Sequence, residues 1–174
     1  HYHMVFPTFR RKNNNTHGSF NVSFDRPLVI KVDEKKAYEK LHKVTIDNFL
    51  TISSYFNFIH IDRVSYCASE YPGVITRISF TNTSNELKLI SIKNIIEETS
   101  CENDYYDRPY HIESILMGSD ERRLNKNYEF MISPNETRHI YYIIRCKYDD
   151  DTSKIRLRPE YNLTSNMFSN FDFN

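Results

Sequence analysis

The sequence is poor in glycine. It contains only three glycines, Gly18, Gly73 and Gly118, among 174 residues, against roughly 12 expected at an average usage of about 7%. Loops that cradle phosphate groups need several closely spaced glycines, because only glycine lets the backbone approach the phosphate closely. This shortage excludes nucleotide binding by glycine-rich loops.

The sequence also lacks an excess of charge of one sign, and it lacks long apolar runs. Lys plus Arg number 23, and so do Asp plus Glu, so the chain as a whole has no field that would hold a nucleic acid. The short basic clusters at residues 10–12, 35–36 and 122–123 are interpreted as solvated surface. No apolar run approaches the roughly 18 residues of a membrane-spanning helix. We therefore expect neither nucleic-acid binding nor a membrane span in this chain.

Motifs for metal binding and catalysis are absent as well. The seven histidines are scattered, and the three cysteines show no Cys-X-X-Cys spacing. We therefore expect no metal site, no cofactor and no catalytic residues. Residues 149–160 carry oxygen atoms at the spacing of a calcium loop, but Lys154 stands where such a loop requires glycine, so a β-turn is the better interpretation. An enzyme stays a competing hypothesis that requires a deep polar pocket converging on His, Asp or Cys.

Large apolar side chains, in contrast, are abundant and alternate with polar ones. The sequence has 12 Phe and 13 Tyr but no Trp, which is enough apolar surface to build one buried core. Residues 44–64 are rich in β-branched and aromatic residues and predict one or two strands. The other strands predicted from alternation are 20–24, 28–30, 74–80, 87–92, 111–117, 128–132, 140–148 and 155–157. Short strands separated by turns predict a mainly β, antiparallel sandwich.

One short helix is predicted near residues 33–43. Asp33 is a typical residue to cap the start of a helix, and Ala37, Leu41 and Val44 follow at helical spacing. The sequence therefore predicts a single helical element beside the strands.

The domain organisation follows from these patterns. Residues 1–18 are polar, basic and Asn-rich, and are interpreted as an N-terminal tail or edge segment. Residues 19–160 are predicted to form a single sandwich domain, and the mostly polar residues 97–127 are interpreted as a long insertion in it. Residues 161–174 are predicted to be a polar C-terminal tail.

Sequons for N-glycosylation favour the secretory pathway. Five Asn-X-Ser/Thr sequons occur, against roughly 2.6 expected by chance. Several fall in predicted turns or polar segments, where a bulky glycan is tolerated. The predicted glycosylation sites are Asn14, Asn21, Asn82, Asn135 and Asn162. We therefore expect a secreted protein or one in the lumen of the secretory pathway.

Three cysteines permit one disulfide bond and one spare thiol. Cys146 lies on the apolar face of a predicted strand and is interpreted as a buried small residue. Cys67 and Cys101 lie in polar, loop-like surroundings, so we predict that these two pair, with a stabilisation of about 3 to 4 kcal/mol from chain entropy. The leftover cysteine leaves a reducing compartment open.

Two stretches share a pattern of strand, polar turn and strand. The first is Phe-Thr-Asn-Thr-Ser at residues 80–84, followed by alternating aliphatic residues at 87–92, and the second is Phe-Met-Ile-Ser-Pro-Asn-Glu-Thr at 130–137. Asn82 and Ser84 are expected to hydrogen-bond the backbone of their turn. Together these stretches, within residues 74–148, resemble the PapD-like group of immunoglobulin-like sandwiches, which includes the major-sperm-protein and ASH domains.

This resemblance implies an immunoglobulin-like fold and a role in protein binding rather than catalysis. Lumenal examples in the group occur in large membrane proteins that assist procollagen secretion, and cytosolic examples bind short peptides or scaffold cilia. The leading hypothesis is therefore a secreted or lumenal, glycosylated sandwich that binds another protein.

Two competing hypotheses also involve interaction modules. A secreted decoy from a virus or parasite, directed at a host immune receptor or ligand, fits the Asn-, Ile- and Tyr-rich composition typical of AT-rich genomes. A cytosolic scaffold domain predicts three free thiols. The candidate protein-binding residues are Tyr105, Tyr106, Arg108 and Tyr110, because exposed Tyr and Arg dominate interaction hot spots. The alternative for these rings is that they cover the end of the sandwich.

Overall fold

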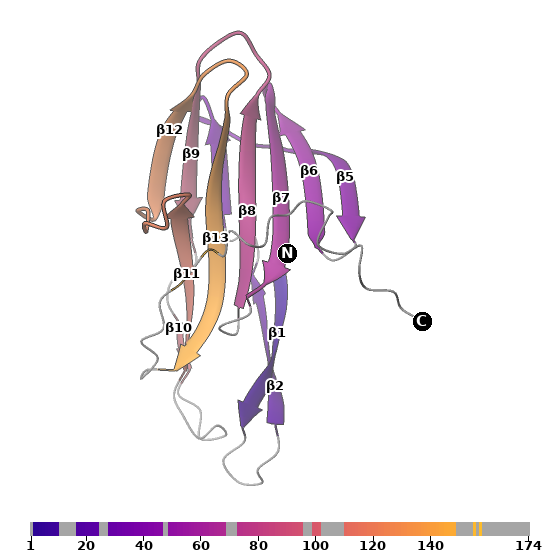
Figure 1. The fold of residues 1–174 in the computed structure, drawn as a ribbon, viewed down its shortest axis with the longest axis vertical. Coiled ribbons are helices and arrows are strands. Elements are labelled where there is room, and N and C mark those ends of the chain that lie inside the picture. The colour runs from indigo at the N-terminus through magenta and orange to yellow at the C-terminus, as the bar shows by residue number, and fades with distance from the viewer. Residues whose placement is uncertain are drawn as a thin grey trace.

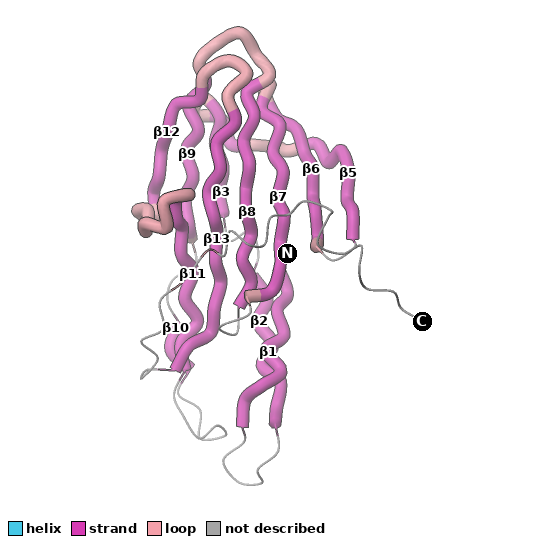
Figure 2. The backbone as a smooth tube through the Cα atoms, in the orientation of Figure 1, coloured by secondary structure: helices cyan, strands magenta, loops and turns pink. Residues whose placement is uncertain are grey.

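The computed structural model of the chain describes residues 2–10, 17–24, 28–46, 49–68, 73–95, 99–101 and 110–148, together with residues 155 and 157. The described chain is mainly β and forms two antiparallel sheets and a separate hairpin (Figure 1). No helix occurs among the described residues (Figure 2). The predicted antiparallel arrangement of strands is confirmed, and the two facing sheets fit a β-sandwich.

The larger sheet has seven strands in the order β10-β11-β13-β8-β7-β6-β5. Each strand runs antiparallel to its neighbours. The strands are β5 (Lys40–Ile46), β6 (Leu50–Phe56), β7 (Ile59–Cys67), β8 (Gly73–Asn82), β10 (Thr99–Cys101), β11 (Tyr110–Gly118) and β13 (Thr137–Tyr148). β5 and β10 are therefore the two edges of this sheet.

The smaller sheet has four strands in the order β12-β9-β3-β4. These strands are β3 (Leu28–Val32), β4 (Lys35–Lys36), β9 (Lys88–Asn94) and β12 (Asn127–Ile132). β1 (Tyr2–Arg10) and β2 (His17–Phe24) pair with each other as the separate hairpin. The smaller sheet thus has three strands fewer than the larger one.

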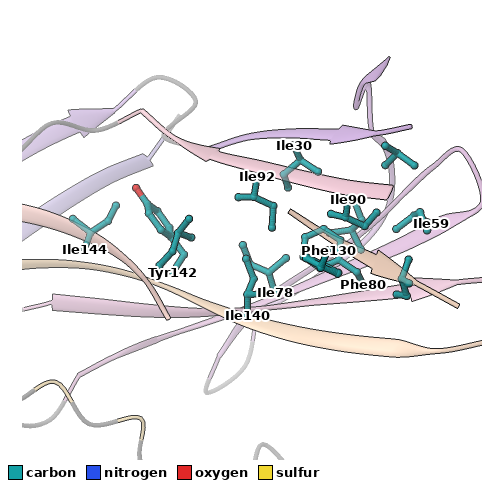
Figure 3. Close-up of a cluster of buried hydrophobic side chains, with 14 of the residues drawn as sticks. Ile30, Ile59, Ile78, Phe80, Ile90, Ile92, Phe130, Ile140, Tyr142 and Ile144 are labelled. Carbon is teal, nitrogen blue, oxygen red and sulfur yellow. The ribbon is translucent and has the colours of Figure 1, made fainter. Parts of the chain in front are cut away.

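The core lies between the two sheets (Figure 3). Ile90 and Ile92 of the smaller sheet pack there against Ile78, Phe80 and Ile140 of the larger sheet, and all five side chains are at most 3% exposed. Burying each such side chain is worth roughly 1.5 to 3 kcal/mol. Alternate residues of these strands enter the core, as expected for strands predicted from period-2 alternation.

The larger sheet also buries apolar side chains on its other face. Ile75, Ile115, Met117 and Ile143 form a second cluster there, together with Leu157. Ile143 and Tyr142 are neighbours in β13 and are both at most 1% exposed, so this strand is buried on both faces.

The helix predicted near residues 33–43 is wrong. Asp33 and Glu34 have φ of 48° and 64° and form the two-residue turn between β3 and β4, where the right-handed twist of the strands favours positive φ. β5 follows, and a bulge between Leu41 and Lys43 shifts its register. The bulge places Leu41 and Val44, three residues apart, on one face of the strand, and this produced the apparent helical spacing.

Strands occupy other segments whose role was predicted from polarity. Residues 2–10, part of the segment interpreted as an N-terminal tail or edge segment, form β1, which pairs with β2. Within the predicted insertion 97–127, the strand predicted at 111–117 is confirmed as β11, which lies in the larger sheet between β10 and β13. A turn with positive φ at Asn57 and Phe58 divides the segment 44–64. Residues 161–174 lie outside the described residues.

Candidate interaction surface

Asn82 is a structural residue rather than a glycan acceptor. It is 0% exposed, and its side-chain nitrogen donates hydrogen bonds to the carbonyl oxygens of Glu86 (2.7 Å) and Ile132 (3.1 Å). Its side-chain oxygen accepts hydrogen bonds from the backbone nitrogen and hydroxyl of Ser84 (2.9 and 2.7 Å). A glycan would replace one N–H donor and needs open space at that nitrogen, so the structure contradicts glycosylation of Asn82. The predicted turn hydrogen bonds of Asn82 and Ser84 are confirmed.

Of the other four sequons, the structure describes the exposure of Asn135 alone. Asn135 is exposed in the turn before β13, with φ of 59°. Asn21 lies in β2, and Asn14 and Asn162 lie outside the described residues. Glycosylation at these four positions stays a prediction.

The predicted disulfide between Cys67 and Cys101 is wrong. Cys67 is the last residue of β7 and is an exposed, free thiol. Cys101 ends β10, which lies four strands away in the same sheet. Four strand spacings amount to roughly 19 Å across the sheet, whereas the Cα atoms of a disulfide lie at most about 7 Å apart. The prediction that Cys146 is buried is confirmed, since it is 1% exposed.

The predicted aromatic interaction residues are not assembled into a site by the described structure. Tyr105, Tyr106 and Arg108 lie outside the described residues. Tyr110 is the first residue of β11 and pairs with Cys101 and Tyr148 in the ladders on its two sides. Protein binding through these four residues stays a prediction.

Ser79 and His139 form a hydrogen-bonded pair on the outer face of the larger sheet. Nδ1 of His139 lies 2.8 Å from the Ser79 hydroxyl. Burial, and then the charge of Arg77, lower the pKa of His139 below its ordinary value. The neighbouring Asp62 accepts a hydrogen bond from Ser53 (2.5 Å) and does not contact the His139 ring. The pair therefore links the neighbouring strands β8 and β13 on this face.

Apolar side chains are exposed where the larger sheet extends beyond the smaller one. We call Leu41, Val44 and Ile46 of β5, together with Leu50 of β6, the overhang face. These side chains are 66%, 46%, 79% and 39% exposed. They lie on the sheet face that forms the core farther along, because Val44 pairs with Ile52 and Leu41 with Ser54, and Ser54 with the core residue Ile61. Figure 2 shows β5 and β6 at the side of the molecule opposite β12.

A partly buried ion pair holds the connection between the two sheets beside the overhang face. Residues 37–39 lead from β4 to β5, and the Glu39 carboxylate accepts two 2.6 Å hydrogen bonds from Arg63 of β7 and one of 2.5 Å from Ser54. Burial raises the pKa of the Glu39 carboxyl, but the Arg63 and Ser54 hydrogen bonds and the Arg63 charge more than offset this, so the pKa is below its ordinary value. The connection is thereby fixed to the larger sheet.

A second polar cluster fixes the turn at the start of this region. The Asp33 carboxylate accepts hydrogen bonds from Lys88 Nζ (2.9 Å), Asn57 Nδ2 (3.2 Å) and the Leu89 backbone nitrogen (3.1 Å). Burial opposes ionisation, but Lys88 and the other donors hold the pKa of Asp33 below its ordinary value. Both carboxylates near the connection are therefore already matched by a cation.

The connection also borders a pocket. Its volume is about 370 Å³, and it is lined by residues 28–30 of β3 and residues 36–39. Tyr38, one of these lining residues, is 74% exposed. β4 pairs with β3 only at Lys31 and Val32, so among the described strands none pairs with this edge of β3 at Leu28 and Val29, beside the pocket. Pocket, connection and overhang face form the candidate interaction surface.

These residues were missed because the sequence pattern predicted a helix there. The signal that could have identified β5 is the β-branched run Val44-Thr45-Ile46, which favours a strand. The exposure of β5 could not have been predicted from the sequence, because that exposure depends on where the smaller sheet ends.

No protein-family model matches the sequence, and a search of curated proteins finds no match. The resemblance to the PapD-like group therefore stays a prediction. Within the described ranges, no three His, Cys, Asp or Glu side chains lie close enough to share a metal ion. The described part of the chain also contains no helix suited to crossing a membrane.

Proposed function

We propose that this chain is a non-catalytic, immunoglobulin-like module that binds another protein, and that the overhang face is its binding surface. The observation that carries this proposal is the row formed by Leu41, Val44 and Ile46, of which the most exposed is 79% exposed. Apolar side chains gathered on one face of an edge strand indicate an interaction site, whereas single exposed apolar residues are ordinary. The row also adjoins an open strand edge, which peptides use for recognition.

Strands β5 and β6 meet a requirement of such a surface, namely that it is preformed. β6 pairs with β7 along its whole length, and the Glu39–Arg63 ion pair fixes the connection beside it. A surface that is already ordered loses less conformational entropy on binding than a mobile loop does. The overhang face is therefore suited to bind without rearrangement.

The test is site-specific photo-crosslinking in the cells that express the protein. A photoreactive amino acid replaces Ile46 in one variant and Met131 of β12 in a control. Met131 is an exposed apolar residue, 43% exposed, at the far edge of the smaller sheet. We expect a protein adduct at position 46 that is absent at position 131 and is lost when Val44→Asp is added. Identical adducts at both positions, or none at position 46, would contradict the proposal.

We place the module in the secretory pathway, and the support for this is the exposed sequon at Asn135. Treatment of the protein secreted from eukaryotic cells with an N-glycosidase should lower its mass, and Asn135→Gln should remove part of that change. Asn82→Gln should leave the mass change as it is, because Asn82 is buried. Absence of any mass change would contradict the assignment.

One observation favours a second candidate, the cytosolic scaffold domain. Cys67 is a free, exposed thiol, and such thiols persist most readily in a reducing compartment. The two candidates share the overhang face as binding surface and differ in compartment. The glycosidase measurement therefore decides between them, while the crosslinking measurement tests the binding surface that they share.

A further inference from the structure

The two faces of β5 differ in chemistry. Lys40 and Lys43 are opposite Tyr55 and Ser53 of β6, and so lie on the outer face of the sheet. Leu41, Val44 and Ile46 lie on the overhang face. One face of this strand therefore presents positive charge, and the other presents apolar surface.

Positive charge is concentrated in the segment 31–43, which runs from β3 into β5, although the chain as a whole is neutral. Five lysines in the segment 31–43 are exposed: Lys31, Lys35, Lys36, Lys40 and Lys43. Of the three carboxylates in the same segment, Glu39 is matched by Arg63 and Asp33 by Lys88, which leaves Glu34. Within the described part of the chain, none of these five lysines forms an ion pair. The segment thus carries an unmatched positive charge.

Two of these lysines lie directly opposite each other. Lys31 of β3 pairs with Lys36 of β4 in the ladder, and Lys36 also lines the pocket beside the connection. Like charges in directly opposed positions of a ladder destabilise it. An anionic group bound beside them would relieve this repulsion, so the region favours an acidic partner.

β5 is also the edge of the larger sheet. Half of the backbone N–H and C=O groups of an edge strand point outward, and an added strand would satisfy them. Side chains of an added strand alternate between the two sheet faces. A partner strand along β5 therefore places every second side chain beside Lys40 and Lys43, and the others beside Leu41, Val44 and Ile46.

We propose that β5 binds an extended segment of the partner protein, in which acidic residues alternate with large apolar residues, as an added strand of the larger sheet. This inference rests on the proposed function, which requires only that the overhang face bind a protein. The acidic side chains pair with the lysines of the outer face, and the apolar side chains cover the overhang face.

Two simpler roles of these features account for less of the structure. Lysines on an edge strand protect it from aggregation, but that role does not require three exposed apolar side chains on the other face. An anionic membrane would also attract the lysines, but it would leave the outward N–H and C=O groups of β5 without partners in an apolar medium. A strand of alternating chemistry satisfies the backbone, the charges and the apolar side chains together.

The experiment measures binding of a synthetic peptide with seven residues, the length of β5, that alternates Glu and Val. It has blocked ends and carries a fluorescent label on a short glycine linker. One control peptide has Lys in place of Glu, and another has the same composition with the Glu and Val residues in separate blocks. Fluorescence anisotropy gives the affinities, and hydrogen exchange locates the protected backbone amides.

We expect the alternating acidic peptide to bind at least about tenfold more tightly than either control, because like charges across an interface are strongly unfavourable. Its affinity should fall as salt is added. Exchange should slow at residues 40–46. Lys43→Glu should weaken binding about tenfold and improve binding of the Lys peptide, while the exposed Lys126→Glu, placed before β12, should change neither.

Several outcomes would overturn the inference. These are equal binding of the acidic and Lys peptides, protection outside residues 40–46, binding of anionic phospholipid vesicles without binding of the peptide, or a dimer that protects β5 and excludes the peptide. If position 46 crosslinks to a partner while the acidic peptide does not bind, the inference alone fails and the proposed function stands. If positions 46 and 131 give the same crosslinks, the proposed function fails whatever the peptide does.

Discussion

The guanidinium of Arg63 donates a hydrogen bond of 2.6 Å to each oxygen of the Glu39 carboxylate. The two side chains are 13% and 23% exposed, and the Ser54 hydroxyl donates a third hydrogen bond to the same carboxylate. Such two-pronged pairs fix geometry as well as adding energy. This pair joins the connection from the smaller sheet to the centre of β7, and so determines how β5 leaves the sandwich.

Removal of Arg63 should destabilise the protein. Arg63→Met leaves the Glu39 carboxylate in a partly buried site without its cation, and we expect the free energy of unfolding in urea to fall by about 2 kcal/mol. The control is Arg122→Met, which removes an exposed ion pair. The Arg122 side chain is 85% exposed, and its Nε lies 3.6 Å from Asp120 Oδ2. That change should cost less than about 0.5 kcal/mol. Equal losses in the two variants would contradict a structural role of the Arg63 pair.

The same pair should make stability depend on pH in the acid range. The pKa of Glu39 is lower in the folded protein than its ordinary value of 4.5, so its contribution is present above that value and is lost as pH falls through the folded pKa. The free energies of unfolding of the wild type and of Glu39→Gln, measured from about pH 7 to pH 3, should therefore converge as pH decreases. Asp33 also titrates with a lowered pKa, but it does so in both proteins and cancels. A constant difference over this range would contradict the prediction.

Loss of the Asn82 side chain should be costly for a different reason. Asn82→Ala leaves the carbonyl oxygen of Ile132 without its Asn82 donor in a buried place and removes the acceptor of two Ser84 hydrogen bonds. We expect a loss of about 3 kcal/mol in the free energy of unfolding. Asn85→Ala changes an exposed asparagine of the same turn and should be within about 0.5 kcal/mol of the wild type. Similar effects of the two substitutions would argue against the central role of Asn82.

The cysteines should differ in reactivity. In a Cys101→Ser variant, a maleimide reagent should modify Cys67 rapidly in the folded protein, because this thiol is exposed at the end of β7. Cys146 is 1% exposed and should react only when the protein opens, and hence slower by orders of magnitude. Mass spectrometry of the labelled peptides measures both rates. Protection of Cys67 in the folded state would contradict its exposure.

Local pattern was sufficient to predict the central strands. In β9 the chain alternates between the core and the opposite face, whereas β8 and β13 are buried on both faces over part of their length. Period 2 identified these strands and the residues that share a face in each of them. The turn at Asn82 was also predictable, since Asn and Ser bind backbone groups within a few residues. In the segment after Asp33 the local pattern gave a wrong prediction, because a bulge in β5 places apolar residues at the spacing of a helix face.

The candidate site could not be predicted in the same way. Lys35 and Lys36 appeared as ordinary surface charge, and Leu41 and Val44 appeared as one side of a helix. Where these side chains lie on the surface depends on the turn at Asp33 and on the pairing of β5 with β6. The predicted disulfide was wrong for a related reason. The number of residues between Cys67 and Cys101 does not show that β7 and β10 lie four strands apart in the sheet.

The sequence by itself determined that this chain forms β-strands, which side of most core strands is apolar, and which residues hold the turn at Asn82. These properties depend on neighbours within a few residues, so they can be predicted from the alternation of apolar and polar residues and from the residues of the turn. Only the tertiary structure decided that Asn82 is enclosed, that Cys67 is a free thiol and that β5 is an edge of the larger sheet among the described strands. Each of these depends on strands that meet from distant parts of the chain, and on a smaller sheet that ends before the larger one does.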